Sequence, residues 1–77
     1  ELFTAMSTYN KEVASIERIL LYLPRDAKAH LQLGRVHEKY QQYDRAIASY
    51  RMALSIRPGF QAARQALSAV LEMSESR

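Results

Sequence analysis

The chain has 77 residues, of which 48% are hydrophobic and 25% are charged, and its formal net charge is +3. This composition is ordinary for a soluble globular domain, and acidic residues interrupt the arginines, which argues against a disordered chain or a basic block. The absence of cysteine excludes disulfides, thiolate metal ligands and cysteine nucleophiles. The longest apolar stretch, Ile19 to Pro24, is far shorter than the roughly 20 residues of a membrane span, and the start shows no secretory signal pattern.

The first predicted helix begins at Asn10, which can act as its N-cap, and continues to about Leu23. Pro24 ends it, because proline disfavours the helical conformation in the residue before it. Leu2, Phe3 and Met6 make the segment before Tyr9 apolar enough for a helical stub. The apolar stripe of the first helix follows spacings of three and four residues, as the helical period requires, and consists of Val13, Ile16, Ile19, Leu20 and Leu23.

A second helix is predicted from Ala27 to about Tyr40, with Asp26 as its N-cap. Gln41 and Gln42 form a tight turn, and Asp44 is expected to cap a third helix that extends to about Ile56. The predicted buried side of the second helix carries His30, Leu33, Val36, His37 and Tyr40. The predicted buried side of the third helix carries Ala46, Ile47, Tyr50, Ala53 and Leu54.

The pair Pro58-Gly59 breaks the chain before a fourth helix, from about Phe60 to Met73. This helix is expected to bury Ala63, Leu67, Val70 and Leu71. Gly34 inside the second helix costs about 1 kcal/mol relative to alanine, which suggests that packing requires it. Gly34 and Ala46 both lack bulk, so the second and third helices are expected to approach near the short end of the usual range of about 8–10 Å.

The chain resembles itself at a shift of 34 residues. The shift carries Tyr9 to Tyr43, Ala14 to Ala48, Ser15 to Ser49, Leu20 to Leu54 and Pro24 to Pro58. A fixed period of roughly 34 residues is typical of helix–turn–helix repeats, and about three such units are needed for a continuous core. The chain holds fewer. We therefore expect either a segment of a longer array, which the first residue Glu1 also favours, or a chain that completes its core by self-association.

Residues 27–60 resemble one complete tetratricopeptide repeat. The family pattern of a large residue, Leu-Gly, an aromatic, Ala, an aromatic, Ala and Pro falls on His30, Leu33-Gly34, His37, Ala46, Tyr50, Ala53 and Pro58. Residues 9–24 resemble the second half of a preceding repeat, but Glu12 and Ile19 stand where the family prefers alanine, which loosens the expected helix contact. Residues 61–74 resemble a following or capping helix. The resemblance implies one all-α domain over residues 1–77, with about four antiparallel helices in helix–turn–helix repeats.

The resemblance further implies a scaffold for protein–protein interaction, which binds a peptide or helix of a partner on the concave face of the array. That face corresponds to Lys28, Leu31, Gln32, Arg35, Glu38 and Lys39, followed by Ala62, Gln65, Ala69 and Glu72. These residues could equally form a merely solvated face. A clamp for chaperone tails is not expected, because Leu31, Gln32 and Arg35 stand where that branch of the family needs Lys or Asn.

The alternative function is self-assembly, in which exposed repeat ends stack on copies of the same chain. The apolar residues expected at the two ends are Leu2, Phe3 and Met6, and Val70, Leu71 and Met73. Terminal repeats generally need a polar outer face to stay soluble alone, and neither end has an obvious one. The sequence therefore favours a homo-oligomer or a part of a longer repeat array.

Catalytic and metal sites are not expected. His30 and His37 are two helical turns apart, at about 10 Å, so one metal ion cannot easily bind both, and we interpret them as packing residues. The serines lack a glycine-elbow context, and Gly34 and Gly59 cannot form a phosphate-binding loop, so we expect neither an enzyme nor a cofactor. Without a basic groove beside the tyrosines, nucleic-acid binding is not expected either. The sequence thus predicts a cytoplasmic protein with a protein or peptide partner.

Overall fold

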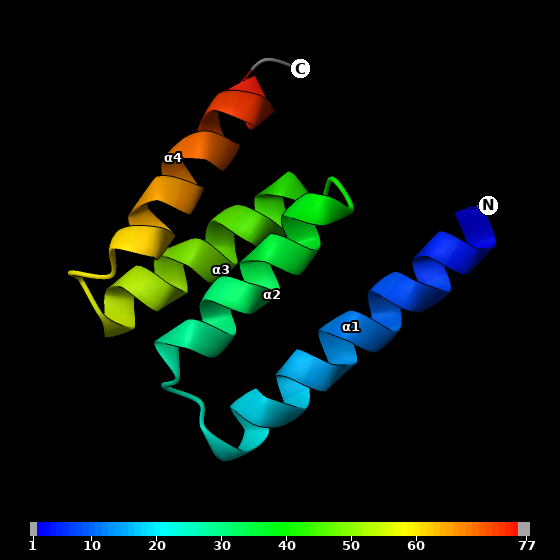
Figure 1. The fold of residues 1–77 in the computed structure, drawn as a ribbon, viewed down its shortest axis with the longest axis horizontal. Coiled ribbons are helices and arrows are strands. Elements are labelled where there is room, and N and C mark those ends of the chain that lie inside the picture. Colours follow the sequence, from blue (N-terminus) through cyan, green and yellow to red (C-terminus); the bar gives the residue numbers. More distant parts are fainter. Residues whose placement is uncertain (1, 76–77) are drawn as a thin grey trace.

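The computed structural model describes the backbone of residues 2–75 and the side chains of residues 6–75, which form four α-helices and no strand. The helices are α1 (Leu2–Tyr22), α2 (Ala27–Lys39), α3 (Tyr43–Ile56) and α4 (Gln61–Glu75). Consecutive helices run antiparallel and are joined by short loops (Figure 1). The predicted all-α fold of helix–turn–helix units is confirmed.

The helix α1 is longer than predicted, and Asn10 is not its N-cap. The helix already includes Leu2, and Asn10 lies well inside it. No proline or glycine precedes Pro24, and an asparagine in a helix interior costs at most about 0.7 kcal/mol relative to alanine. This cost is too small to end the helix by itself. The side chains of Leu2 and Phe3 lie outside the described residues.

The N-terminus of α2 has the predicted cap. Asp26 lies in an extended conformation, and its Oδ1 accepts hydrogen bonds from the backbone N–H groups of Lys28, at 3.1 Å, and Ala29, at 3.4 Å. These bonds satisfy two of the donors that a helix leaves unpaired at its start. Asp26 therefore fixes where α2 begins.

The C-terminus of α2 is closed by the turn predicted at Gln41 and Gln42. The Gln41 N–H donates to the carbonyl of Glu38 at 2.9 Å, and the Gln42 N–H donates to that of His37 at 2.8 Å. This is the Schellman arrangement, and it places Gln41 at a φ of 63°, in the left-handed region. The helix therefore ends at Lys39, and Tyr40 is its C-cap.

The helix α3 begins at Tyr43, so Asp44 is not its N-cap. The cap position is held by Gln42, whose side chain makes no capping hydrogen bond. Asp44 lies in the first turn, where a negative charge interacts favourably with the unpaired N–H groups of the helix. Asp44 therefore does mark the N-terminus of α3, as predicted, but as a residue of the first turn and not as the N-cap.

The 34-residue repeat is also present in the backbone hydrogen bonds. The loop after α1 and the loop after α3 contain the same two backbone hydrogen bonds. In each loop the first bond spans four residues, and the second, three residues later, spans three. The first loop joins Leu23 to Ile19 and Asp26 to Leu23, and the second joins Arg57 to Ala53 and Phe60 to Arg57. It follows that α1 and α3 occupy equivalent places in successive units, and so do α2 and α4.

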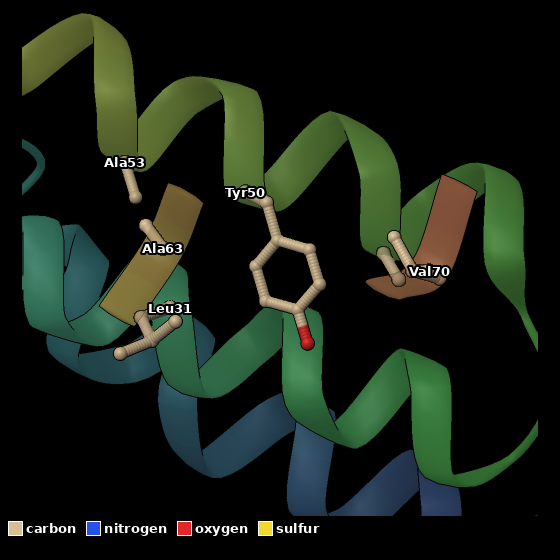
Figure 2. Close-up of a cluster of buried hydrophobic side chains, with 6 residues drawn as sticks. Leu31, Tyr50, Ala53, Ala63 and Val70 are labelled. Carbon is tan, nitrogen blue, oxygen red and sulfur yellow. The ribbon is translucent and has the colours of Figure 1, made fainter. Parts of the chain in front are cut away.

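The main core lies between α2, α3 and α4. Its buried residues are Leu31, Ala46, Tyr50, Ala53, Ala63 and Val70, five of which are labelled in Figure 2. The prediction placed all of them in the core except Leu31, which it assigned to the partner-binding face. The other predicted core residues of α3 and α4 are half-buried; Ile47, Leu54 and Leu67 pack at the edge of this cluster.

Gly34 permits the close approach of α2 and α3, and the group that requires it is the ring of Tyr50. A Cβ atom on Gly34 would lie 2.6 Å from Cδ1 and 3.0 Å from Cζ of this ring. Tyr50 is completely buried, so the ring has no solvent-filled space into which it could move. The sequence predicted a contact of Gly34 with Ala46, which lies about one helical turn before Tyr50.

The helix α1 packs against α2 through a smaller cluster. Its buried members are Ile16, Ala29 and Leu33, and Val13, Leu20 and Val36 pack at its edge. Ile19 and Leu23, which were predicted to belong to the same stripe, are exposed. Among the described helices, only α2 comes close to the backbone of α1. One side of α1 therefore has no neighbouring helix among the described residues, and its apolar side chains are exposed to solvent.

A buried hydrogen-bonded group links α1 to both α2 and α3. The Tyr9 hydroxyl lies 2.8 Å from Nδ1 of His37 and accepts a hydrogen bond from Nη1 of Arg45 at 3.3 Å. Because Arg45 donates to the hydroxyl oxygen, the hydroxyl proton can be donated to an unprotonated Nδ1. Burial and the neighbouring Arg45 charge lower the pKa of His37 from 6.5, against a smaller opposite effect of Glu17. His37 is thus a neutral packing residue, as predicted.

Substitution of Gly34 by leucine should overpack the junction of α2 and α3. We expect a loss of about 1–3 kcal/mol in the free energy of unfolding, because the added side chain must displace the Tyr50 ring. The matched control is Gly59→Leu, since nothing lies within 4 Å of a Cβ built on Gly59. Thermal and urea unfolding measure both variants. Equal stability of the Gly34→Leu variant and the wild type would contradict the close approach.

Acidification should weaken the fold through His37. The pKa of His37 is lower in the folded chain than its ordinary value of 6.5, so the unfolded chain binds more protons in this range. Stability is therefore fully present above pH 6.5 and should fall as the pH drops from 6.5 towards the folded pKa. Urea unfolding between pH 5 and pH 8 measures this, and the slope should disappear in His37→Phe but persist in His30→Phe. A slope that survives in His37→Phe would show that another group carries it.

Candidate functional site

A shallow groove of about 390 Å³ lies between α2 and α4. Arg35, Glu38 and Lys39 line it from α2, Ala66 and Ala69 line it from α4, and Tyr50 of α3 lies between the two helices. Because α2 and α4 are equivalent helices of successive units, the groove follows the face formed by the first helix of each unit. Four of the residues predicted to bind a partner meet here: Arg35, Glu38, Lys39 and Ala69.

The helical spacing explains why these side chains share one face. Glu38 and Lys39 lie three and four residues after Arg35 on α2, and Ala66 and Ala69 are three residues apart on α4. The α2 wall therefore carries long charged side chains, whereas the α4 wall carries alanines that end at Cβ. The groove has one charged side and one small apolar side.

Tyr50 joins the core to the groove. Its ring is buried, and Figure 2 shows its hydroxyl directed towards α2, where it donates a hydrogen bond to Oε1 of Glu38 at 2.7 Å. Burial, and then this hydrogen bond, raise the pKa of Tyr50, so the hydroxyl stays protonated and remains a donor. The Glu38 carboxylate is therefore held in place from the core side of the groove, because its Oε1 already accepts the hydrogen bond from Tyr50.

Lys39 is also held by a partner within the chain. Its Nζ forms an ion pair with Oε1 of Glu12 on α1 at 2.8 Å, and the Tyr40 hydroxyl donates to Oε2 of Glu12 at 2.6 Å. The hydrogen bond from Lys39, and then that from Tyr40, lower the pKa of Glu12, and the same pair raises the pKa of Lys39. Glu12, which replaces the alanine of the repeat pattern, thus links α1 to α2.

Arg35 has no such partner. Its side chain is exposed, and no described residue forms a hydrogen bond or an ion pair with it. A guanidinium group offers five N–H donors in a planar arrangement that fits a carboxylate in two places at once. Among the three charged residues of the groove, Arg35 is therefore the one with no hydrogen-bonding or ion-pair partner among the described residues.

The remaining predicted partner-binding residues lie outside the groove lining. Leu31 was assigned to the exposed face, and this is wrong: it is 7% exposed and packs in the core with Ala63 of α4, which covers that side of α2. The exposed residues beyond the groove are Lys28, Gln32, Gln65 and Glu72. Tyr50 and Ala66 were not among the residues predicted for the site. Ala66 could have been found, because it lies three residues before Ala69 on the same helix face.

The two histidines each have a hydrogen-bonding partner and do not meet at a common site. Nε2 of His30 lies 3.1 Å from the carbonyl oxygen of Pro24, and His37 contacts Tyr9. Within residues 6–75, no three histidine or acidic side chains come together as a metal-binding group would require. In the part of the chain that the structure describes, no helix combines the length and the apolar character needed to cross a membrane.

Two comparisons relate parts of this chain to known proteins. The chain is 26% identical over 57 residues to Cell division cycle protein 27 homolog A of Arabidopsis thaliana, in an alignment that covers 74% of this chain and 8% of that protein. The chain therefore spans a small part of the length of this curated relative. No solved structure matches the chain. The family model described as "Tetratricopeptide repeat" matches residues 27–60.

The matched residues contain α2, the Schellman turn, α3 and the loop that follows α3. The resemblance stated from the sequence rests on these same residues, with Gly34 against Tyr50 at the centre of the unit. Residues 27–60 therefore match the tetratricopeptide repeat family over one complete unit.

Proposed function

We propose that the chain is a protein-interaction module that binds an extended peptide or a helix of a partner in the groove between α2 and α4. Tetratricopeptide repeats generally mediate interactions between proteins, and repeat arrays present extended concave surfaces for this purpose. The observation that carries the proposal is the groove itself, where Arg35 lies without an intramolecular partner beside the low wall of Ala66 and Ala69. This role is one of binding, and we expect no catalysis.

The groove suits a partner that brings both an acidic and an apolar group. Arg35 can receive a carboxylate, while the alanines of α4 leave room for a backbone or a small apolar side chain. Lys39 is already paired with Glu12, and Glu38 already accepts a hydrogen bond from Tyr50. In this proposal these two side chains orient the bound peptide more than they attract it by charge. The partner's carboxylate therefore pairs with Arg35 in this proposal.

Self-assembly is a second candidate, and one observation favours it. Several large apolar side chains of the described residues are exposed, and four of them lie between Ile19 and Leu23. The ends themselves offer less than was expected, because Val70 is completely buried in the core and Leu71 is half-buried. Met6 and Met73 are exposed near the two ends. Self-assembly is therefore better supported at α1 than at the end of α4.

Reversal of the charge at Arg35 tests the groove. Peptides selected from a displayed random library for binding to the wild-type chain serve as probes, and their affinity is measured by calorimetry. Arg35→Glu should weaken the binding of acidic peptides by about tenfold or more, and the loss should shrink at high salt, because the carboxylate of the peptide then meets a like charge.

The matched control is Arg51→Glu, an equal charge reversal at an exposed position on α3. This variant should bind as the wild type does, and both variants should keep the wild-type helicity. If Arg35→Glu and Arg51→Glu bind every selected peptide as tightly as the wild type, the groove is not the binding site. Lys39 is left unchanged, because its reversal would also place a like charge beside Glu12.

A further inference from the structure

The loop after α1 exposes apolar side chains that the equivalent loop after α3 does not. Tyr22 is 84% exposed and Leu23 is 56% exposed. Their equivalents 34 residues later are Ile56, which is half-buried, and Arg57, which is exposed. The two loops share their backbone hydrogen bonds, so what distinguishes them is their side chains. Leu23 thus stands where the second loop has an exposed cation, and the packing of one unit on the next does not explain it.

In the loop after α3, the chain covers its own apolar side chain. The Arg57 guanidinium lies 4.9 Å from the centre of the Phe60 ring, and Phe60 packs at the edge of the main core. The loop after α1 has Leu23 and Asp26 at these two positions. The Asp26 carboxylate is turned to the backbone N–H groups of α2, which it caps. The pair of side chains that closes the second loop is therefore missing from the first.

A hollow of about 430 Å³ lies at the loop after α1, and we refer to it as the loop hollow. Three apolar and two charged residues line it: Tyr22, Leu23, Pro24, Arg25 and Asp26. An exposed apolar patch with a polar rim is typical of a binding surface. The loop hollow has room for one large side chain of a partner.

Hydrogen bonds hold this loop in one shape. The Asp26 N–H donates to the carbonyl of Leu23 at 3.1 Å, and Nε2 of His30 lies 3.1 Å from the carbonyl oxygen of Pro24. The cap that Asp26 forms on α2 fixes the loop at its other end. A partner therefore meets a surface that is already formed, and little affinity is lost to ordering it.

The edge of the molecule that carries this loop is basic. Because consecutive helices run antiparallel, the loops after α1 and α3 lie at the same end of the helices (Figure 1). Residues 19–30 and 53–64, which form the two loops and the adjoining helical turns, contain four basic residues and one acid, and so account for the whole formal net charge of +3. The four basic residues are all exposed: Arg25, Lys28, Arg57 and Arg64. This edge therefore favours an anionic partner.

Two of these cations are available beside the loop hollow. Arg25 lines it, and Lys28 lies in the first turn of α2 that follows the loop. No described residue forms an ion pair or a hydrogen bond with either side chain. Lys28 was predicted to bind a partner but does not line the groove between α2 and α4, and its place at this edge gives it a different binding role.

We propose that the loop hollow binds an acidic segment of a partner protein, with one large apolar side chain in the hollow and carboxylates paired with Arg25 and Lys28. The apolar lining favours an apolar group and the unpaired cations favour carboxylates, and a peptide segment supplies both within a few residues. The tetratricopeptide repeat, which residues 27–60 match, generally mediates interactions between proteins, and this favours a protein segment over a lipid surface or a nucleic acid. A second copy of the chain suits the loop hollow poorly, because a two-fold contact there would bring two basic edges together.

The loop hollow is a surface apart from the groove between α2 and α4. The two share no lining residue. The proposal therefore goes beyond the proposed function, and an experiment can separate the two surfaces.

A displayed library of random peptides, selected on the Arg35→Glu variant, tests the loop hollow. This variant lacks the free cation of the groove, so the selection favours other surfaces. We expect acidic peptides that contain one large apolar residue. Arg25→Glu, added to the same chain, should weaken their binding by about tenfold or more, as measured by calorimetry, and the loss should shrink at high salt. Leu23→Ser should weaken binding to a similar degree at low and high salt, because it removes the apolar wall of the hollow.

Two matched controls make the same kinds of change elsewhere. Arg51→Glu and Met52→Ser alter exposed positions of α3, where Met52 is 48% exposed, and both should leave the binding of these peptides unchanged. Tyr22→Ser is a second change in the hollow. Because Tyr22 is 84% exposed and its side chain makes no hydrogen bond that holds the loop, this variant keeps the test valid if Leu23→Ser unsettles the loop. Circular dichroism checks that every variant keeps its helices.

The results that would overturn the proposal are distinct from those that concern the groove. A selection that enriches no acidic peptides overturns it, and so do acidic peptides that bind the Arg25→Glu and Tyr22→Ser variants as tightly as the parent chain. Sedimentation of the chain with phosphatidylserine vesicles that depends on Arg25, without any selected peptide, would assign the edge to lipid instead. None of these results bears on the groove, which is tested by Arg35→Glu against the wild type, and failure of the groove leaves the loop hollow unaffected.

Discussion

The contact between Gly34 and the ring of Tyr50 is the constraint on which most of the structure depends. It sets how close α2 and α3 lie, because the ring occupies the space that a Cβ on residue 34 would need. The same ring fills the centre of the core between α2, α3 and α4, and its hydroxyl reaches the Glu38 carboxylate on α2. A buried polar hydroxyl without such an acceptor would cost about 1–3 kcal/mol, so the hydrogen bond stabilises the placement of the ring. Core packing and groove geometry are therefore coupled through one side chain.

The electrostatic character of the groove follows from which charges the fold already satisfies. Tyr50 engages Glu38 from the core, and Glu12 engages Lys39 from α1. Arg35 lies about one helical turn before both Glu38 and Lys39 on α2, and no described residue forms a hydrogen bond or an ion pair with it. Arg35 and Lys39 outnumber Glu38 among the residues that line the groove, and Glu12 pairs with Lys39 from outside it. Arg35 is therefore the cation of the groove that can bind an anionic group of a partner. The helix α1 influences the charge of the groove through Glu12, although no residue of α1 lines the groove.

The comparison of α1 with α3 shows how equivalent helices acquire different surfaces. Both helices follow the same loop geometry, but α3 lies against α2 and α4, whereas among the described helices α1 lies against α2 alone. Ala53 is completely buried in this setting, and its equivalent Ile19 is exposed. The hydrogen-bonded group of Tyr9, His37 and Arg45, in which Tyr9 and His37 are buried, compensates in part, because it ties α1 to α2 and α3 by directional bonds. The apolar residues that remain open on α1 are the basis for its proposed role in association.

The sequence by itself determined the elements and their order. The period of 34 residues, the two prolines, the Asp26 cap and the turn at Gln41 and Gln42 are local signals, and each corresponds to a local hydrogen bond or a backbone restriction. Gly34 also indicated a close helix contact, because a glycine in a helix interior has a cost that packing must offset. Local signals failed at Asn10 and Asp44, since a residue that can cap a helix is also tolerated within one.

The tertiary structure alone decided which polar and apolar groups meet. The family resemblance placed Leu31 on the partner-binding face with Lys28 and Arg35, but α4 covers that part of α2, so Leu31 is buried while Arg35 stays exposed. The link from Glu12 to Lys39 and that from Tyr50 to Glu38 join residues on different helices. Helical periodicity gives the direction of a side chain from its own axis. What covers that direction depends on the neighbouring helix, and this is information that only the packed structure contains.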